Sequence, residues 1–299
     1  MPVAEGLAKA YENYYTHAEE KKKRGMVGRR LARLPINLLN SLFIRLLGIR
    51  KQRQAMRYLG LKELPPGRML EIGCGRGERL CLFRDMGWEI TGQDIDIKAV
   101  AHVKAARGVD VLCGELASLG LDSEQFDVII MSHVLEHVPD IREIISECFR
   151  LLTVGGRLII LTPNAESFGH RKFGKNWRGL EPPRHLHVFS RDNMQALLHQ
   201  HNFCQVSVQT NAANARGLFE ESYLLREGIV SRDEKYPSTH IYCMSLLLQY
   251  KEWILSRVYP QIGEELFVQA FKQSVVREGS QVELTAPHPY SQPRTCHHK

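Results

Sequence analysis

The chain has 299 residues and a formal net charge of +7, from 40 Lys and Arg against 33 Asp and Glu. Hydrophobic residues make up 43% and charged residues 24%, which is ordinary for a globular protein and excludes a wholly disordered or collagen-like chain. The charge is uneven: residues 21–57 hold twelve Lys or Arg and no acid, and the rest of the chain carries 28 basic and 33 acidic residues. The sequence therefore predicts a mildly acidic body with one basic arm.

Within the basic arm, apolar residues recur at helical spacing over residues 36–49, namely Leu39, Leu42, Phe43, Leu46 and Ile49. This pattern predicts an amphipathic helix with basic flanks, too short and too polar to span a bilayer. Three roles are open for it: packing on its own domain, docking on an anionic membrane surface, or binding nucleic acid.

The cysteine content and the first fifteen residues indicate the compartment. The seven cysteines are odd in number and form no CxxC pair, which favours a reducing cytoplasm over a disulfide framework. MPVAEGLAKAYENYY lacks the apolar stretch of a signal peptide. We expect a cytoplasmic protein, with a peripheral position at the inner membrane face open through the basic arm.

From Gly67 onward, short apolar runs alternate with helical stretches. Strand–helix alternation of this kind is typical of a parallel sheet with helices on both sides. The pattern predicts strands over residues 68–72, 89–93, 109–112, 127–131, 157–162, 203–209 and 265–272, and helices over 78–86, 97–106, 141–152, 191–201, 215–226 and 242–258.

A glycine-rich loop follows the first strand, as Gly73-x-Gly75-x-Gly77. Glycines are needed where the backbone turns sharply and approaches a ligand. Dinucleotide folds use GxGxxG, whose third glycine would fall at Glu78 in this chain. Because Glu71 stands just before the loop, the pattern disfavours a pyrophosphate and favours a ligand with a positive group.

Two acids follow the next strands. Asp94 comes 21 residues after Gly73, where an acid can accept hydrogen bonds from ribose hydroxyls. Its alternative role is to cap the following helix, for which Asp96 is better placed. Glu115 follows the third strand, where it could accept from an adenine amine or be only a solvated turn residue.

Over residues 67–210, five motifs resemble, in order and spacing, those of class I S-adenosylmethionine-dependent methyltransferases. They are LEIGCGRG, GQDID, GEL, FDVIIMSHVLEHVPD and RLLTVGGRLIILTPN. HVLEHVPD and TPN most resemble a bacterial small-molecule and glycan subgroup similar to ubiquinone-biosynthesis O-methyltransferases. The resemblance implies an α/β fold, a Rossmann-like doubly wound seven-stranded sheet with only the last strand antiparallel. We expect a helical arm over residues 1–60, a methyltransferase domain over 61–272 with a helical insertion at about 211–262, and a flexible tail over 273–299.

The resemblance also implies roles in holding the methyl donor, S-adenosyl-L-methionine. The methionine end would be held by Glu71 and the loop of Gly73, Cys74, Gly75 and Gly77; the ribose by Asp94 with Ile95; and the adenine by Glu115 with Leu116. Ser132 and His133, just past the fourth strand, would approach the methionyl group.

The block His133-Val-Leu-Glu-His137 also matches the HxxEH signature of inverted zinc peptidases. That interpretation needs a long helix, whereas here the block directly follows a strand and Pro139 interrupts it. Some quinone O-methyltransferases use a divalent cation near a matching acid and His, but they have an acid where this chain has His133. We therefore predict no metal; His137 is a candidate catalytic residue or a structural histidine.

A long segment of residues 164–190 follows the fifth strand, at the edge where open parallel sheets bind ligands. Trp177 could wall a pocket there. His185 is the best candidate for a general base, because an imidazole titrates near working pH. The alternative is that His185 and His187 only hold the segment in place. His133 completes the catalytic candidates.

These features predict methyl transfer from S-adenosylmethionine to a small-molecule, lipid-linked or glycan acceptor, with a hydroxyl favoured. A nucleic-acid methyltransferase is the first alternative, although the (Asp/Asn/Ser)-Pro-Pro-aromatic motif of amino-methylases is absent after the fourth strand, where the chain reads Ser132-His-Val-Leu. The second alternative is a catalytically idle binding module. The oligomeric state is left open.

Overall fold

The computed structural model describes residues 34–229 and 237–273, so the predicted tail lies almost wholly outside the described residues. The described chain forms two compact units. One, here called the helical unit, consists of the described parts of residues 1–62, 162–191 and 209–266. The other, the sheet unit, consists of the described parts of residues 63–161, 192–208 and 267–299.

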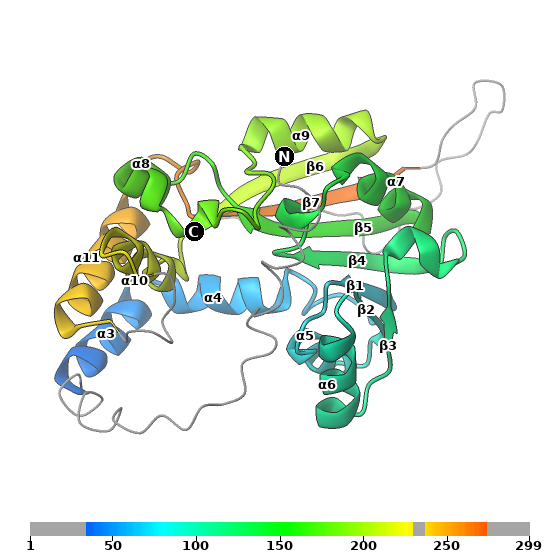
Figure 1. The fold of residues 1–299 in the computed structure, drawn as a ribbon, viewed down its shortest axis with the longest axis horizontal. Helices are drawn as coiled ribbons and strands as arrows, with labels where there is room; N and C mark the ends of the chain where they lie inside the picture. Colours follow the sequence, from blue (N-terminus) through cyan, green and yellow to red (C-terminus); the bar gives the residue numbers. More distant parts are fainter. Residues whose placement is uncertain (1–33, 230–236, 274–299) are drawn as a thin grey trace. The chain divides into compact units, whose positions relative to one another are not determined.

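The strands form one seven-stranded sheet in the order β3-β2-β1-β4-β5-β7-β6 (Figure 1). The neighbouring pairs from β3 to β5 are parallel, and the predicted mixed sheet with an antiparallel last strand is confirmed. The strands are β1 Arg68–Ile72, β2 Glu89–Asp94, β3 Val111–Cys113, β4 Phe126–Ser132, β5 Leu152–Pro163, β6 Phe203–Asn211 and β7 Glu265–Lys272.

The helices of the sheet unit are α5 Glu78–Arg84, α6 Ile97–Arg107, α7 Ile141–Leu151 and α9 Arg191–Gln200. In Figure 1, α5 and α6 lie on one side of the sheet and α7 and α9 on the other. Because both faces are covered, the central strand β4 buries Val128, Ile129, Ile130 and Met131 completely. This burial explains the continuous apolar run that predicted the strand.

The helical unit contains α3 Leu34–Leu46, α4 Ile49–Tyr58, α8 Phe168–Phe173, α10 Ala215–Arg226 and α11 Thr239–Leu255. One hydrophobic cluster joins α8, α10 and α11 through Phe173, Phe219 and Leu248. A second joins Ile49 to Ala212, Ala213 and Trp253. Among the residues that the structure places, no helix is long and apolar enough to cross a membrane.

Two predictions differ from the structure in more than the bounds of an element. The single helix expected over residues 36–49 is instead two helices, because Gly48 adopts φ 74° and ends the helical path between α3 and α4. The segment 164–190, expected to be a loop, contains α8 and the short 3₁₀ turns Gly174–Asn176 and Arg178–Leu180.

Candidate active site

The glycine loop connects the end of β1 at Ile72 to the start of α5 at Glu78. Gly73 has φ 64°, and a Cβ there would lie 2.5 Å from Cγ2 of Val134, in the loop after β4. At Gly77, with φ 68°, an added Cβ would lie 2.8 Å from Cγ1 of Val103. These two positions therefore require glycine both for backbone conformation and for close packing.

Asp94 ends β2 and holds the glycine loop. Its Oδ2 accepts a hydrogen bond from the backbone N of Gly75 at 2.9 Å, and its Oδ1 accepts one from the N of Asp96 at 2.9 Å. Asp96 itself caps α6 by accepting from the N of Lys98, as predicted. Asp94 is therefore not the helix cap. A carboxylate has about four acceptor positions, so Asp94 can still accept from a ligand hydroxyl beside its bonds to the backbone N of Gly75, Ile95 and Asp96.

Gln93 is a loop-positioning residue that sequence reasoning missed. Its Oε1 accepts from the N of Gly73 at 3.3 Å, and its Nε2 donates to the carbonyl of Gly114. The amide thus joins the loop after β1 to the turn after β3. The amide of Gln93, between Gly92 and Asp94 in a predicted strand, was the available signal, because a polar group buried in a strand needs partners.

Glu71 lies on β1 and is only 4% exposed. Arg79 donates to its Oε1 at 3.1 Å, while its buried Oε2 has no hydrogen-bond partner among the described residues. Burial raises the pKa of Glu71 to about 7, against the opposing effect of Arg79. An unpartnered buried carboxylate oxygen fits the ammonium of a methionyl group, so these residues fit S-adenosylmethionine.

The loop after β4 carries the other predicted residues of the sheet unit. Ser132 ends β4 and His133 adopts φ 55°, with its backbone N donating to Leu161 at 2.8 Å. Nδ1 of His133 lies 3.3 Å from Oε1 of the fully buried Glu136. Leu135–His137 forms a single 3₁₀ turn, so the block lacks the long helix of a zinc peptidase.

The remaining predicted cofactor residues differ in exposure. Ile95 is 68% exposed and Glu115 is exposed, while Leu116 is buried in the turn after β3. Glu115 makes no side-chain cap on that turn. Burial raises the pKa of Cys74 to about 12, so this loop thiol is held neutral and unreactive.

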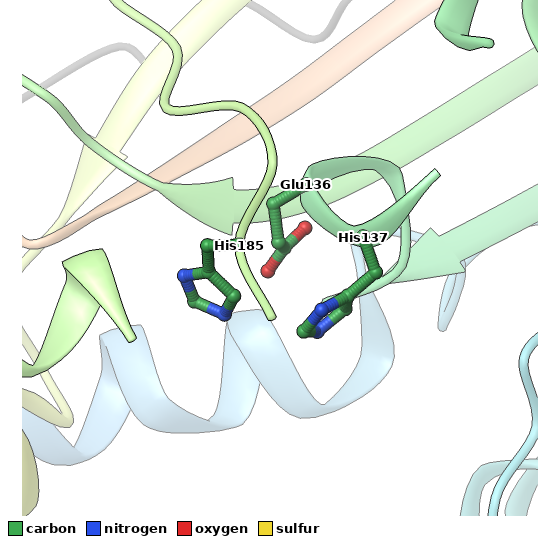
Figure 2. Close-up of side chains that lie close together, drawn as sticks. All are labelled: Glu136, His137 and His185. Carbon is green, nitrogen blue, oxygen red and sulfur yellow. The ribbon is translucent and has the colours of Figure 1, made fainter. Parts of the chain in front are cut away.

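His185 belongs to the helical unit, in the segment after β5 (Figure 2, which also labels Glu136 and His137 of the loop after β4). Its Nδ1 lies 2.7 Å from the carbonyl oxygen of Gly179. Because a carbonyl only accepts, Nδ1 carries the proton, and in the neutral form of the ring the lone pair lies at Nε2. Nε2 is 3.6 Å from Oε2 of Glu181. The other oxygen of Glu181, Oε1, pairs with Arg178 and Arg184.

Trp177 does not wall a pocket, contrary to expectation. The side chain is fully buried in the hydrophobic cluster with Phe173 and Phe219, and its Nε1 donates to Oε2 of Glu264 at 2.7 Å. The other Glu264 oxygen accepts from the backbone N of Gly169. Glu264, which stands just before β7, thus anchors the segment after β5. Sequence reasoning missed it because its partners lie 87 and 95 positions away.

Comparison with known proteins shows the family of this chain. The model of the family described as "Methyltransferase domain" matches residues 46–208, more than half of the chain. The chain therefore belongs to the methyltransferase domain family.

Particular relatives carry more specific names. A probable S-adenosylmethionine-dependent methyltransferase of Mycolicibacterium smegmatis is 39% identical over 119 residues, covering 39% of this chain and 46% of the relative. A ubiquinone biosynthesis O-methyltransferase of Rhodopseudomonas palustris is 30% identical over 173 residues, covering 56% of this chain and 67% of the relative. The chain thus spans about half the length of the first of these relatives.

Among solved structures, phosphoethanolamine N-methyltransferase 2 of Haemonchus contortus superimposes with a TM-score of 0.50. The two share 15% identity, and the match covers 75% of this chain and 53% of the other. At this identity, the likeness bears on the fold alone.

Proposed function

We propose that this protein is an S-adenosylmethionine-dependent methyltransferase whose acceptor is a hydroxyl on a small-molecule, lipid-linked or glycan substrate. The observation that carries the proposal is the bond from Gly75 to Asp94, beside the buried, half-partnered carboxylate of Glu71. Together these two carboxylates, beside the glycine loop, suit a ribose and an ammonium and disfavour a pyrophosphate. The name of the Rhodopseudomonas relative favours oxygen as the methylated atom.

In this proposal the chain contributes binding, alignment and a proton acceptor. When bound, S-adenosylmethionine supplies an electrophilic methyl group attached to a sulfonium sulfur. Loss of the methyl group leaves this sulfur as a neutral thioether. Glu71 holds the methionyl ammonium through Oε2, and the Asp94 carboxylate accepts from the ribose hydroxyls. Exact alignment and exclusion of water do most of the catalytic work in such a displacement.

A hydroxyl acceptor must also lose its proton, and His185 is the proposed base. Hydrogen bonding of Nδ1 to the Gly179 carbonyl leaves Nε2 as the atom that would take the proton from the acceptor hydroxyl. Glu181, 3.6 Å from Nε2, would then stabilise the imidazolium. His133 pairs with Glu136, and we assign this pair and His137 to positioning within the loop after β4.

The test is transfer of labelled methyl from S-adenosylmethionine into cell-extract fractions, with lipid and aqueous fractions assayed separately. We expect base-stable, ether-type label in one fraction with the wild type, and less of it with Glu71→Gln at the same donor concentration. Tight donor binding without transfer in any fraction would favour the idle binding module instead. Absence of donor binding would overturn the proposal altogether.

A further inference from the structure

Helix α3 exposes a continuous apolar stripe. Leu38, Leu42 and Leu46 are spaced by four residues, so they lie on one side of the helix, and they are 67%, 52% and 71% exposed. No residue of α3 is buried. Single exposed leucines are normal on protein surfaces, but a row along one helix marks an interaction surface.

The opposite side of α3 already has its partner within the helical unit. Tyr242 and Tyr250 of α11 donate side-chain hydrogen bonds to Oδ1 of Asn37 and Oδ1 of Asn40, and the two helices lie side by side (Figure 1). Since successive residues are about 100° apart, Asn40 and Leu42 point to roughly opposite sides. The leucine stripe is therefore not the face through which α3 packs onto the described part of its unit.

Helix α11 and the residues after it add a second exposed apolar row in the same unit. Leu247, Ile254 and Val258 are all more than half exposed. Lys251 and Arg257 are exposed at interleaved positions, while Glu252, which is the acid nearest to them, is completely buried. From Leu247 to Val258 the exposed residues are therefore apolar or basic, without an exposed carboxylate.

The charge near α3 has the same sign. Arg45, Arg50 and Lys51 are exposed, and the chain has no Asp or Glu between residues 21 and 57. Apolar helix faces with cationic neighbours bind anionic bilayers, because the apolar side chains enter the interface and each nearby cation adds about 1 kcal/mol. A protein partner would be expected to meet polar groups for specific pairing, which the leucine stripe lacks.

We propose that the leucine stripe of α3, with its exposed cationic neighbours, is a docking surface for an anionic phospholipid bilayer. The inference stands on exposure and charge and is independent of the proposed chemistry. It assigns the charge of the basic arm to localisation rather than to substrate recognition.

The test is co-sedimentation of the full chain with vesicles of phosphatidylcholine alone or mixed with phosphatidylglycerol. We expect binding to the anionic vesicles only, weakened at high salt. The triple change Leu38→Ser, Leu42→Ser, Leu46→Ser should lower the partition coefficient at least about tenfold, given about 1.5–3 kcal/mol per buried leucine. Val154→Ser, at an exposed apolar position of the sheet unit, is the matched control and should bind like wild type.

Because the three leucines are exposed, the triple variant should melt within a few degrees of wild type, which separates docking from folding. Equal binding to both vesicle types, or binding unaffected by the triple change, overturns the proposal. The proposal is also overturned if the full chain binds no vesicles but self-associates in light scattering, and the triple change abolishes this self-association. Binding that appears only after removal of residues 1–33 would also overturn it, by assigning the stripe to that segment.

Discussion

Oδ2 of Asp94 accepts a hydrogen bond from the backbone N of Gly75, 2.9 Å away, and so joins the end of β2 to the loop after β1. The residue expected to bind ribose is therefore also part of the scaffold that shapes the glycine loop. Substitutions at Asp94 must separate these two roles.

We expect Asp94→Ala to weaken binding of S-adenosylhomocysteine by about tenfold or more, because hydrogen bonds to a charged group contribute about 1.5–3 kcal/mol. Calorimetry with the ribose and 2′-deoxyribose forms of the ligand separates the roles: wild type should prefer the ribose form, and Asp94→Ala should not. The matched control is Asp96→Ala, which removes a helix cap at a cost of about 1 kcal/mol in unfolding free energy but leaves affinity unchanged. A ribose preference that survives Asp94→Ala removes the ribose role.

Affinity for the donor should depend on pH through Glu71. Its pKa is raised to about 7, so the carboxylate is largely protonated below that pH and cannot attract an ammonium. We expect the affinity for S-adenosylhomocysteine to rise between about pH 6 and 8, by up to tenfold per pH unit. Glu71→Gln should bind more weakly at pH 8 and lose this slope; an unchanged slope in the variant would assign it to another group.

Stability should fall as pH rises, through the carboxyl of Glu264. Burial raises its pKa to about 7, and the pKa of neighbouring Glu252 is raised well above its usual value by burial and by Glu264. A raised folded pKa means that the folded state binds the proton more tightly, so stability is present below about pH 4.5 and is lost as pH rises through about 7.

The measurement is denaturant unfolding at several pH values. Each such group contributes up to about 1.4 kcal/mol per pH unit within its window. Glu264→Gln should be less stable at pH 5, because an amide cannot accept from both Gly169 and Trp177, and should show a shallower decline toward pH 8. A decline as steep as in wild type would contradict the raised pKa of Glu264.

For the base, His185→Ala should lower kcat by about a hundredfold or more once an acceptor is known, while the KM for the donor stays near its wild-type value. His187→Ala, two positions along the same segment, is the control and should retain most activity. Glu181→Gln should shift the rising limb of the kcat–pH profile, because the imidazolium loses its carboxylate neighbour. Equal rates for wild type and His185→Ala at every pH would retire the assignment.

Chelation distinguishes the metal-free prediction from a cation held near the loop after β4. We expect protein dialysed against a chelator to keep its donor affinity and transfer rate, and added Mg²⁺ or Zn²⁺ to leave both unchanged. Glu136→Gln and His137→Ala provide the comparison. Suppose that wild-type activity is lost on chelation and restored by a cation, and that the same cation does not restore one of the variants. This result would show that a metal acts through the residue changed in that variant, Glu136 or His137.

Local patterns in the sequence determined the sheet, the bounds of β1, α10 and β7, and the glycine loop with its flanking acids. These features depend on the alternation of strand and helix patterns, on helical spacing of apolar residues and on the backbone freedom of glycine. All three are set by residues that are close together in the sequence. The cap at Asp96 was predictable for the same reason.

Tertiary structure alone decided which groups that are distant in the sequence form hydrogen bonds with one another. The burial of Trp177 on Glu264 and the bridge from Gln93 to Gly73 and Gly114 join residues between 20 and 87 positions apart. Burying a polar group requires a partner, but the sequence does not say which one, because that choice is made only when the elements pack together. The same packing turned one side of α3 toward α11 and left its leucines exposed.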